Sequence, residues 1–191
     1  MKRFSSIAAA VLLCLPRPAA AQGFINPFVA TTLTSPSPSG GSSKPGFGIA
    51  FGGIGKVVGG ETEIAFFPEL IDKDANGLAK SRVVTFAGDM LIGPTIGPVK
   101  VYGAFGAGNL HLNVTSLSSV VVPTAATISN NYFTFNAGGG VMGFFLPHLG
   151  ARADLRYSRA FGFKTEDIEN TGLSFDRFDF WRATIGIVAK F

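Results

Sequence analysis

The sequence predicts an all-β protein, an eight-stranded antiparallel up-and-down transmembrane β-barrel that is preceded by a cleavable signal peptide. Hydrophobic residues make up 47% of the chain, yet beyond Ala21 no run approaches the roughly 20 apolar residues of a membrane-spanning helix. Apolar and polar residues instead alternate in about eight segments. The connections between these segments alternate between long and short, as they do in an up-and-down membrane barrel.

The N-terminus has the layout of a secretory signal peptide. A basic tip (Lys2 and Arg3) precedes a short apolar run, which is followed by a small-residue site that ends at Ala21. We therefore expect residues 1–21 to be removed and residues 22–191 to form one barrel domain. Removal would take away the only cysteine and most of the excess positive charge, so the basic precursor is no argument for nucleic-acid binding.

Eight strands are expected after the signal peptide, in the order in which the alternating segments occur. The first, third, fifth (about 113–130) and seventh connections are long, whereas the second, fourth and sixth are tight turns. An even number of strands places both chain ends on the side of the short turns. The expected strands lie near residues 23–31, 46–54, 59–68, 81–92, 97–112, 131–145, 150–161 and 177–191.

Alternation within the strands distinguishes a lipid-facing side from an inner side. In "GARADLRYSR" one face is formed by Ala151, Ala153, Leu155 and Tyr157, and the other by Arg152, Asp154, Arg156 and Ser158. A slip of one residue would place an Arg in lipid at a cost of about 2–4 kcal/mol near the midplane. Two irregularities are expected: a bulge or strand end at Pro27, and a shift of parity between Phe105 and Leu110.

The inner faces carry as many acidic as basic residues when the aliphatic and aromatic face of each strand is taken as lipid-facing. An eight-stranded barrel is just wide enough to be filled by side chains, and an enclosed charge without a partner costs several kcal/mol. We therefore expect an ion-pair network that plugs the lumen. Its predicted members are Glu61, Glu63, Asp89, Lys100, Arg152, Asp154, Arg156 and Arg182.

The chain ends on "FWRATIGIVAKF", in which Phe191, Ala189, Ile187 and Ile185 occupy alternating positions. This ending resembles the C-terminal assembly signal of bacterial outer-membrane barrels. With "INPFVA", "GGGVMGFF" and "ADLRYSR", it makes nearly all of residues 22–191 resemble the small eight-stranded outer-membrane β-barrel family, which includes the transmembrane domain of outer membrane protein A. The resemblance implies an outer-membrane location, contact with outer-membrane lipid, and recognition by the barrel-insertion machinery and periplasmic chaperones during assembly.

The sequence contains only weak matches to motifs of catalytic or ligand-binding sites. "GGGVMG" has the glycine spacing of a dinucleotide loop but no helix follows it. "DKDANG" opens like a calcium loop, yet Val83 stands where the bidentate Glu belongs. The two histidines, His111 and His148, are expected at opposite ends of the barrel and have no recognisable nucleophile pattern beside them. The sequence therefore predicts no catalytic residue, cofactor, metal or nucleic-acid partner.

The function expected from these features is that of a non-enzymatic integral outer-membrane protein with a structural or surface-interaction role. Two alternatives remain open. One is a narrow channel for small or apolar solutes. The other is a soluble lipocalin-like carrier, which would have apolar residues inside and polar residues outside. The sequence does not specify what the long loops bind.

Overall fold

The computed structural model describes residues 22–34, 43–68, 79–117, 125–161 and 179–191. Within these ranges nine β-strands form one antiparallel sheet. One of them, β5 (Thr95–Ile96), is a two-residue strand in a turn. The long strands are β1 (Gln22–Thr32), β2 (Pro45–Ile54), β3 (Val58–Phe67), β4 (Ala79–Ile92), β6 (Val99–Leu117), β7 (Ala125–Phe144), β8 (Leu149–Phe161) and β9 (Asp179–Lys190).

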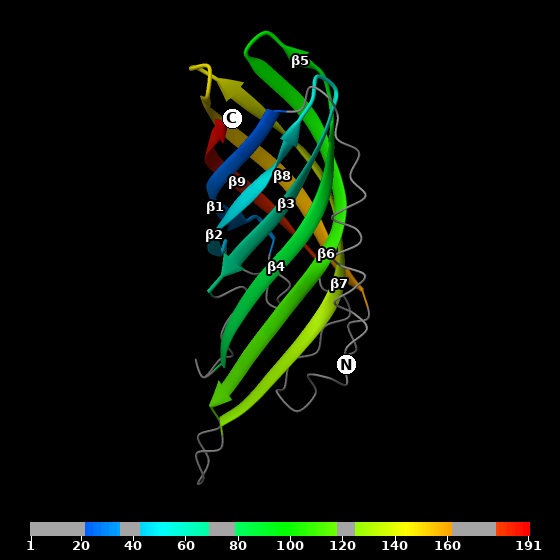
Figure 1. The fold of residues 1–191 in the computed structure, drawn as a ribbon. Coiled ribbons are helices and arrows are strands. Elements are labelled where there is room, and N and C mark those ends of the chain that lie inside the picture. The colour runs from blue at the N-terminus through cyan, green and yellow to red at the C-terminus, as the bar shows by residue number, and fades with distance from the viewer. Residues whose placement is uncertain (1–21, 35–42, 69–78, 118–124, 162–178) are drawn as a thin grey trace.

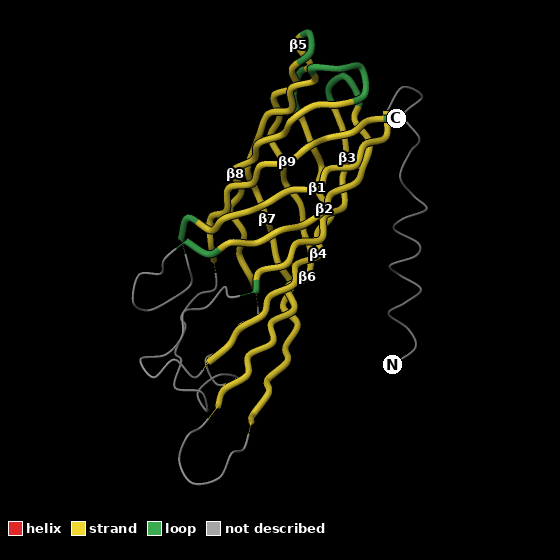
Figure 2. The backbone as a smooth tube through the Cα atoms, turned by 90° about the vertical axis from the view of Figure 1, so that its left-hand side faces the viewer, coloured by secondary structure: helices red, strands yellow, loops and turns green. Residues whose placement is uncertain are grey.

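The eight long strands close into a barrel (Figures 1 and 2). Neighbouring strands follow the order β4-β3-β2-β1-β9-β8-β7-β6, and β4 also pairs with β6 to complete the circle. The first and last strands meet at the β1–β9 seam. No helix among the described residues is long and apolar enough to cross a membrane. The predicted fold class, an eight-stranded antiparallel barrel, is confirmed.

The β6–β7 hairpin is longer than the sequence pattern indicated. Residues 113–130 were expected to form a loop, but β6 continues to Leu117 and β7 begins at Ala125. The two strands remain paired as far as Leu117↔Ala125, and β4 joins the ribbon as far as Ala79↔Ser116. Because Thr and Val in this stretch favour strands when a ladder partner is available, pairing extends the hairpin beyond the other strands (Figure 2).

Pro27 does not produce the expected bulge or strand end. The register of β1 with β2 runs through Pro27↔Ile49 without an inserted residue. On the other side, the ladder with β9 is interrupted at Asn26 and Pro27 and resumes at Phe28↔Gly186. Proline has no N–H to donate, so it removes bonds on one side of the strand while the strand itself continues.

The expected parity shift in the fifth long strand is also absent. Tyr102 and Leu110 both face the barrel interior and are buried, whereas Phe105 faces outward and is exposed. The registers of β6 with β4 and β7 are continuous. Side chains still point alternately inward and outward along β6. Its large apolar residues lie on the outer face at Phe105 but on the inner face at Leu110, because the barrel interior itself contains apolar clusters.

The interior is layered along the barrel axis. One apolar cluster lies near the short turns and includes Phe24, Leu91, Tyr102, Met142 and Val188. Charged residues separate it from a second cluster toward the opposite end, which consists of Phe28, Ala30, Ala50, Ala65, Phe67, Val83, Leu110, Leu112, Tyr132, Ala160 and Phe180. The same order is visible along β9, where Arg182 and Thr184 lie between Phe180 and Val188.

Large apolar side chains also cover the outside of the barrel. Phe47 on β2, Phe133 on β7 and Ile185 on β9 are each more than half exposed. Side chains of this kind occur on the outward face of every long strand from β1 to β9. An apolar exterior around a charged interior is the reverse of the polarity of a soluble lipocalin-like barrel.

Candidate functional site

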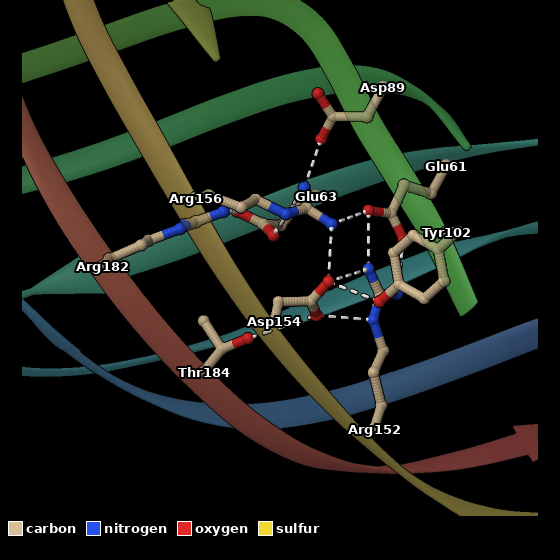
Figure 3. A network of polar contacts seen from close by, with 9 residues as sticks. All are labelled: Glu61, Glu63, Asp89, Tyr102, Arg152, Asp154, Arg156, Arg182 and Thr184. Atoms are coloured by element: carbon tan, nitrogen blue, oxygen red, sulfur yellow. Dashed lines mark hydrogen bonds and ion pairs between the residues drawn. The ribbon is translucent and has the colours of Figure 1, made fainter. Parts of the chain in front are cut away.

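A layer of acidic and basic side chains crosses the barrel lumen (Figure 3). Its carboxylates come mainly from β3, which carries Glu61 and Glu63, and from β4, which carries Asp89. Its guanidinium groups come from β8 and β9. In the circular strand order, β3 and β4 lie across the barrel from β8 and β9. Strand alternation directs all these side chains inward, and none is more than 7% exposed.

Hydrogen-bonded ion pairs connect the two sides of the barrel. The Arg152 guanidinium donates from Nη1 to Glu61 Oε2 at 2.5 Å and from Nη2 to Glu61 Oε1 at 2.9 Å. Arg156 Nη2 donates to the same Glu61 carboxylate, and its Nη1 lies 2.6 Å from Asp89 Oδ2. Two-point contacts between a guanidinium and a carboxylate are the strongest and most directional ion pairs in proteins. Glu61 is therefore held by two arginines from the far wall.

Glu63 receives a third arginine. Arg182 Nη2 lies 2.5 Å from Glu63 Oε1, and Arg156 Nη1 lies 3.6 Å from Glu63 Oε2. Arg182 also lies against the ring of Phe28, with its Cζ atom 6.0 Å from the ring centroid. This contact places the edge of the charged layer directly on the larger apolar cluster.

Asp154 lies on the same wall of the barrel as the arginines and contacts two of them. It lies between Arg152 and Arg156 on β8, because residues two apart on a strand share a face. Its carboxylate accepts from Arg152 Nε at 2.7 Å and from Arg156 Nη2 at 3.4 Å. Tyr102 donates its hydroxyl to Asp154, and Thr184 donates at 3.3 Å. The sequence interpretation did not identify these two hydroxyl groups, although their inward parity was readable.

Like charges are neighbours within each wall. Glu61 is directly opposite Asp89 in the β3–β4 ladder, and Arg156 is directly opposite Arg182 in the β8–β9 ladder. Like charges in opposed positions destabilise a sheet. Bonds across the lumen offset this repulsion, so each wall depends on the other.

Lys100 is the one predicted network member that the structure places apart. It is fully buried inside the barrel, but its Nζ donates to Gly55 O and Gly93 O, each at 3.0 Å, and lies 3.5 Å from Lys56 O. Lys100 follows the turn that contains β5, so its ammonium group reaches the backbone of two short turns and not the carboxylates. The other seven predicted residues are in mutual contact.

Glycines on β7 leave room for the charged layer. A Cβ atom on Gly140 would lie 2.5 Å from Asp154 Oδ1 and 2.6 Å from the Tyr102 hydroxyl. A Cβ atom on Gly138 would lie 3.0 Å from Arg156 Cγ. Their shared inward parity with the buried Met142 is the sequence signal from which this role could have been read.

The C-terminal residues lie at the seam beside the short turns. Phe191 donates its backbone N–H to Gly23 O at 2.9 Å, and its ring covers Gly23 while remaining 79% exposed. Ile185 and Ile187 face outward and are exposed, and Ala189 is half-buried. Residues that alternate along β9 thus form one apolar outer surface that ends at the terminal ring.

The remaining candidates for chemistry are not assembled into a site. His111 Nδ1 contacts Asn131 Oδ1 at 2.9 Å on the extended hairpin, whereas His148 Nδ1 contacts Lys190 O at 3.1 Å beside the short turns. The calcium-like stretch 72–77 lies outside the described residues. Within the described ranges, no group of three or more His, Cys, Asp or Glu residues is placed to hold a metal ion.

Comparisons with known proteins agree on one family. The family model of the outer membrane protein beta-barrel domain matches residues 5–178. No curated protein matches the sequence. Among solved structures, a major outer membrane protein from Thermus thermophilus is similar with a TM-score of 0.63 at 16% identity, over 90% of this chain and 100% of that chain.

Two further structures are similar at lower scores. Neisserial surface protein A gives a TM-score of 0.57 at 12% identity, over 90% of this chain and 97% of that chain. Ail of Yersinia pestis, in complex with the heparin analogue sucrose octasulfate, gives a TM-score of 0.56 at 14% identity, over 90% of this chain and 99% of that chain. At these identities the similarity concerns the fold. The chain belongs to the outer membrane protein β-barrel family and resides in the outer membrane.

Proposed function

We propose that this protein is a non-enzymatic outer-membrane barrel with a structural or surface-interaction role, whose lumen is plugged by the charged layer. The observation that carries the proposal is the set of ion pairs and hydrogen bonds that run from Glu61, Glu63 and Asp89 on one wall to arginines on the opposite wall. A hydrated solute could pass only if several of these bonds broke together.

Apolar packing on both sides of the layer supports the same function. Phe24, Leu91 and Met142 are fully buried on the side of the short turns, and Phe67 and Phe180 are fully or almost fully buried on the other side. Excluding water strengthens an ion pair, because the surrounding dielectric constant falls. The two clusters therefore stabilise the plug, and the narrow-channel alternative would require both clusters and the layer to rearrange.

We propose a surface role for the long connections at the end of the barrel opposite the short turns. In outer-membrane barrels the longer loops face outward and the short turns face the periplasm. The connection after β8 is the longest, and its sequence "GFKTEDIENTGLSFD" is acidic in its middle. We propose that it forms a contact surface for a partner outside the cell. No catalytic residue is part of this proposal.

Two further roles follow from the ends of the chain. Residues 1–21 would act as the export signal that is removed. Phe191, Ala189, Ile187 and Ile185 would be read by the barrel-insertion machinery, since their apolar outer surface ends the last strand. Their recognition during assembly is compatible with the exposed position of the terminal ring at the seam.

A swelling assay on proteoliposomes tests the proposed function. Purified protein is reconstituted into vesicles loaded with an impermeant polymer, and the vesicles are then diluted into small sugars or amino acids. The expected result is a swelling rate equal to that of empty vesicles, with an open porin as the positive control. Rapid swelling with any of these solutes would favour the channel alternative and contradict the plug.

A further inference from the structure

The charged layer contains one more carboxyl group than it contains guanidinium groups. Its acids are Glu61, Glu63, Asp89 and Asp154, and its bases are Arg152, Arg156 and Arg182. The ammonium group of Lys100 is bound to backbone carbonyls at the short turns. If every acid were ionised, the layer would hold an excess negative charge in a buried site, which carries a large desolvation penalty.

Asp89 is the least well-paired of the four acids. Glu61 accepts bonds from two arginines, Asp154 accepts from two arginines and two hydroxyl groups, and Glu63 lies within ion-pair distance of two arginines. Asp89 has one such contact, from Arg156 Nη1 to Oδ2 at 2.6 Å. Its nearest ladder neighbour on β3 is the carboxylate of Glu61, a like charge.

The second carboxyl oxygen of Asp89 lies over Gly106 on β6, and Asn136 is the next residue across, on β7. Asp89 is opposite Gly106 in the β4–β6 ladder, and Gly106 is opposite Asn136 in the β6–β7 ladder. Asp89 Oδ1 occupies the space that a Cβ atom on Gly106 would need, at 2.1 Å from that position. Asp89 Oδ1 and Asn136 Oδ1 are both buried and lack a hydrogen-bond partner among the described residues.

We propose that Asp89 is a protonated carboxylic acid in the folded barrel, and that its Oδ1 hydroxyl donates a hydrogen bond to Asn136 Oδ1 over Gly106. As the barrel folds, the proton passes from a hydronium ion of the solvent to Asp89 Oδ1: one O–H bond of the hydronium breaks, the O–H bond of the acid forms, and a water molecule is left. One proton removes the excess charge of the layer and the repulsion with Glu61. It also turns the unpartnered Asp89 Oδ1 into a donor for the unpartnered Asn136 Oδ1, which satisfies both.

The groups that face Asp89 from each neighbouring wall fit this assignment. With Asp89 neutral, the three ionised acids Glu61, Glu63 and Asp154 balance the three arginines that they contact. Arg156 on β8 continues to donate to Asp89 Oδ2, because the carbonyl oxygen of a carboxylic acid is still an acceptor. The amide of Asn136 on β7 needs only the donor that the acid supplies.

Infrared spectroscopy of the folded wild-type protein at neutral pH tests the proposal directly. A protonated carboxylic acid has a C=O stretching band well separated from the bands of carboxylates and backbone amides. Aspartate labelled isotopically at the side-chain carboxyl should shift this band, and Asp89→Asn should abolish it. Asp179→Asn, which removes an acid outside the charged layer, should leave it in place.

Absence of the band in the wild-type protein would overturn the proposal, because an ionised Asp89 would then share its site with a water molecule or a small cation. Persistence of the band in Asp89→Asn would overturn it as well.

Stability provides a second, independent readout. An asparagine at position 89 reproduces the bonding of the acid: its oxygen accepts from Arg156 and its NH₂ group donates to Asn136 Oδ1. Asp89→Asn should therefore leave the urea midpoint of unfolding unchanged, whereas Glu61→Gln, which removes a charge between two arginines, should lower it clearly. Equal losses in both variants would show that Asp89 is ionised in the native barrel.

Discussion

Arg156 is the residue on which the charged layer depends most, and Arg156→Met is the variant that tests this. Arg156 contacts Glu61, Glu63, Asp89 and Asp154, and it is among the most deeply buried side chains of the barrel. Methionine preserves most of the side-chain length and apolar volume but removes the guanidinium. The carboxylates on the far wall then lose a partner without becoming accessible to water.

The expected loss of stability is about 3–5 kcal/mol, the usual cost of removing one member of a buried ion pair. The upper part of the range is favoured, because Arg156 makes bonds to both β3 and β4 and Glu61 retains only Arg152. Adding Glu61→Gln to Arg156→Met should cost less than the sum of the single changes. The coupling between these two contacting residues should lie within about 0.5–3 kcal/mol.

The assay is reversible urea unfolding in detergent micelles or vesicles, followed by tryptophan fluorescence of Trp181 and by heat-dependent migration on gels. Arg159→Met is the matched control, since Arg159 lies on the same strand but faces outward and is exposed. The control should change stability by no more than about 0.5 kcal/mol. If Arg156→Met lost as little stability as Arg159→Met, the ion pairs across the lumen would not hold the barrel together.

Three other changes should have distinct effects. Phe191→Asp should reduce the yield of folded barrel in cells several-fold while leaving the urea midpoint of the refolded protein nearly unchanged; normal insertion rate and yield would refute the assembly role. Gly140→Ala should destabilise by about 1–3 kcal/mol through overpacking, whereas Gly143→Ala, where a Cβ meets nothing within 4 Å, should not. Equal effects would contradict this explanation. Lys100→Met should cost about 1.5–3 kcal/mol and speed amide exchange in the short turns near Gly55; unchanged exchange there would show that Lys100 does not bind the turns together.

The sequence was sufficient to predict the fold because a membrane barrel has a strict period of two. In "GARADLRYSR" one parity holds Arg152, Asp154 and Arg156, so the inner face of β8 could be assigned without coordinates. Partners across the lumen could not be read in the same way. They depend on the stagger of the strands around the barrel, which determines that Arg152 and Arg156 both reach Glu61.

The errors have a common physical origin in non-local pairing. Residues 113–130 were expected to form a loop, because the ladder partners that extend the hairpin there are not visible from local sequence. Lys100 was counted with the acids from charge balance alone, whereas its position after the β5 turn aims it at backbone carbonyls. The inward Leu110 suggested a shifted register, because an apolar cluster inside the barrel was not anticipated.

Conductance of single barrels in a planar lipid bilayer shows directly whether the lumen is plugged. The wild-type protein, inserted with its folded state verified by heat-dependent migration, should add no steady ohmic current above the bilayer baseline in neutral salt solution. A stable conductance that scales with salt concentration in the wild-type barrel would show a continuous water-filled path through the ion pairs of Glu61 with Arg152 and Arg156, and would contradict the account.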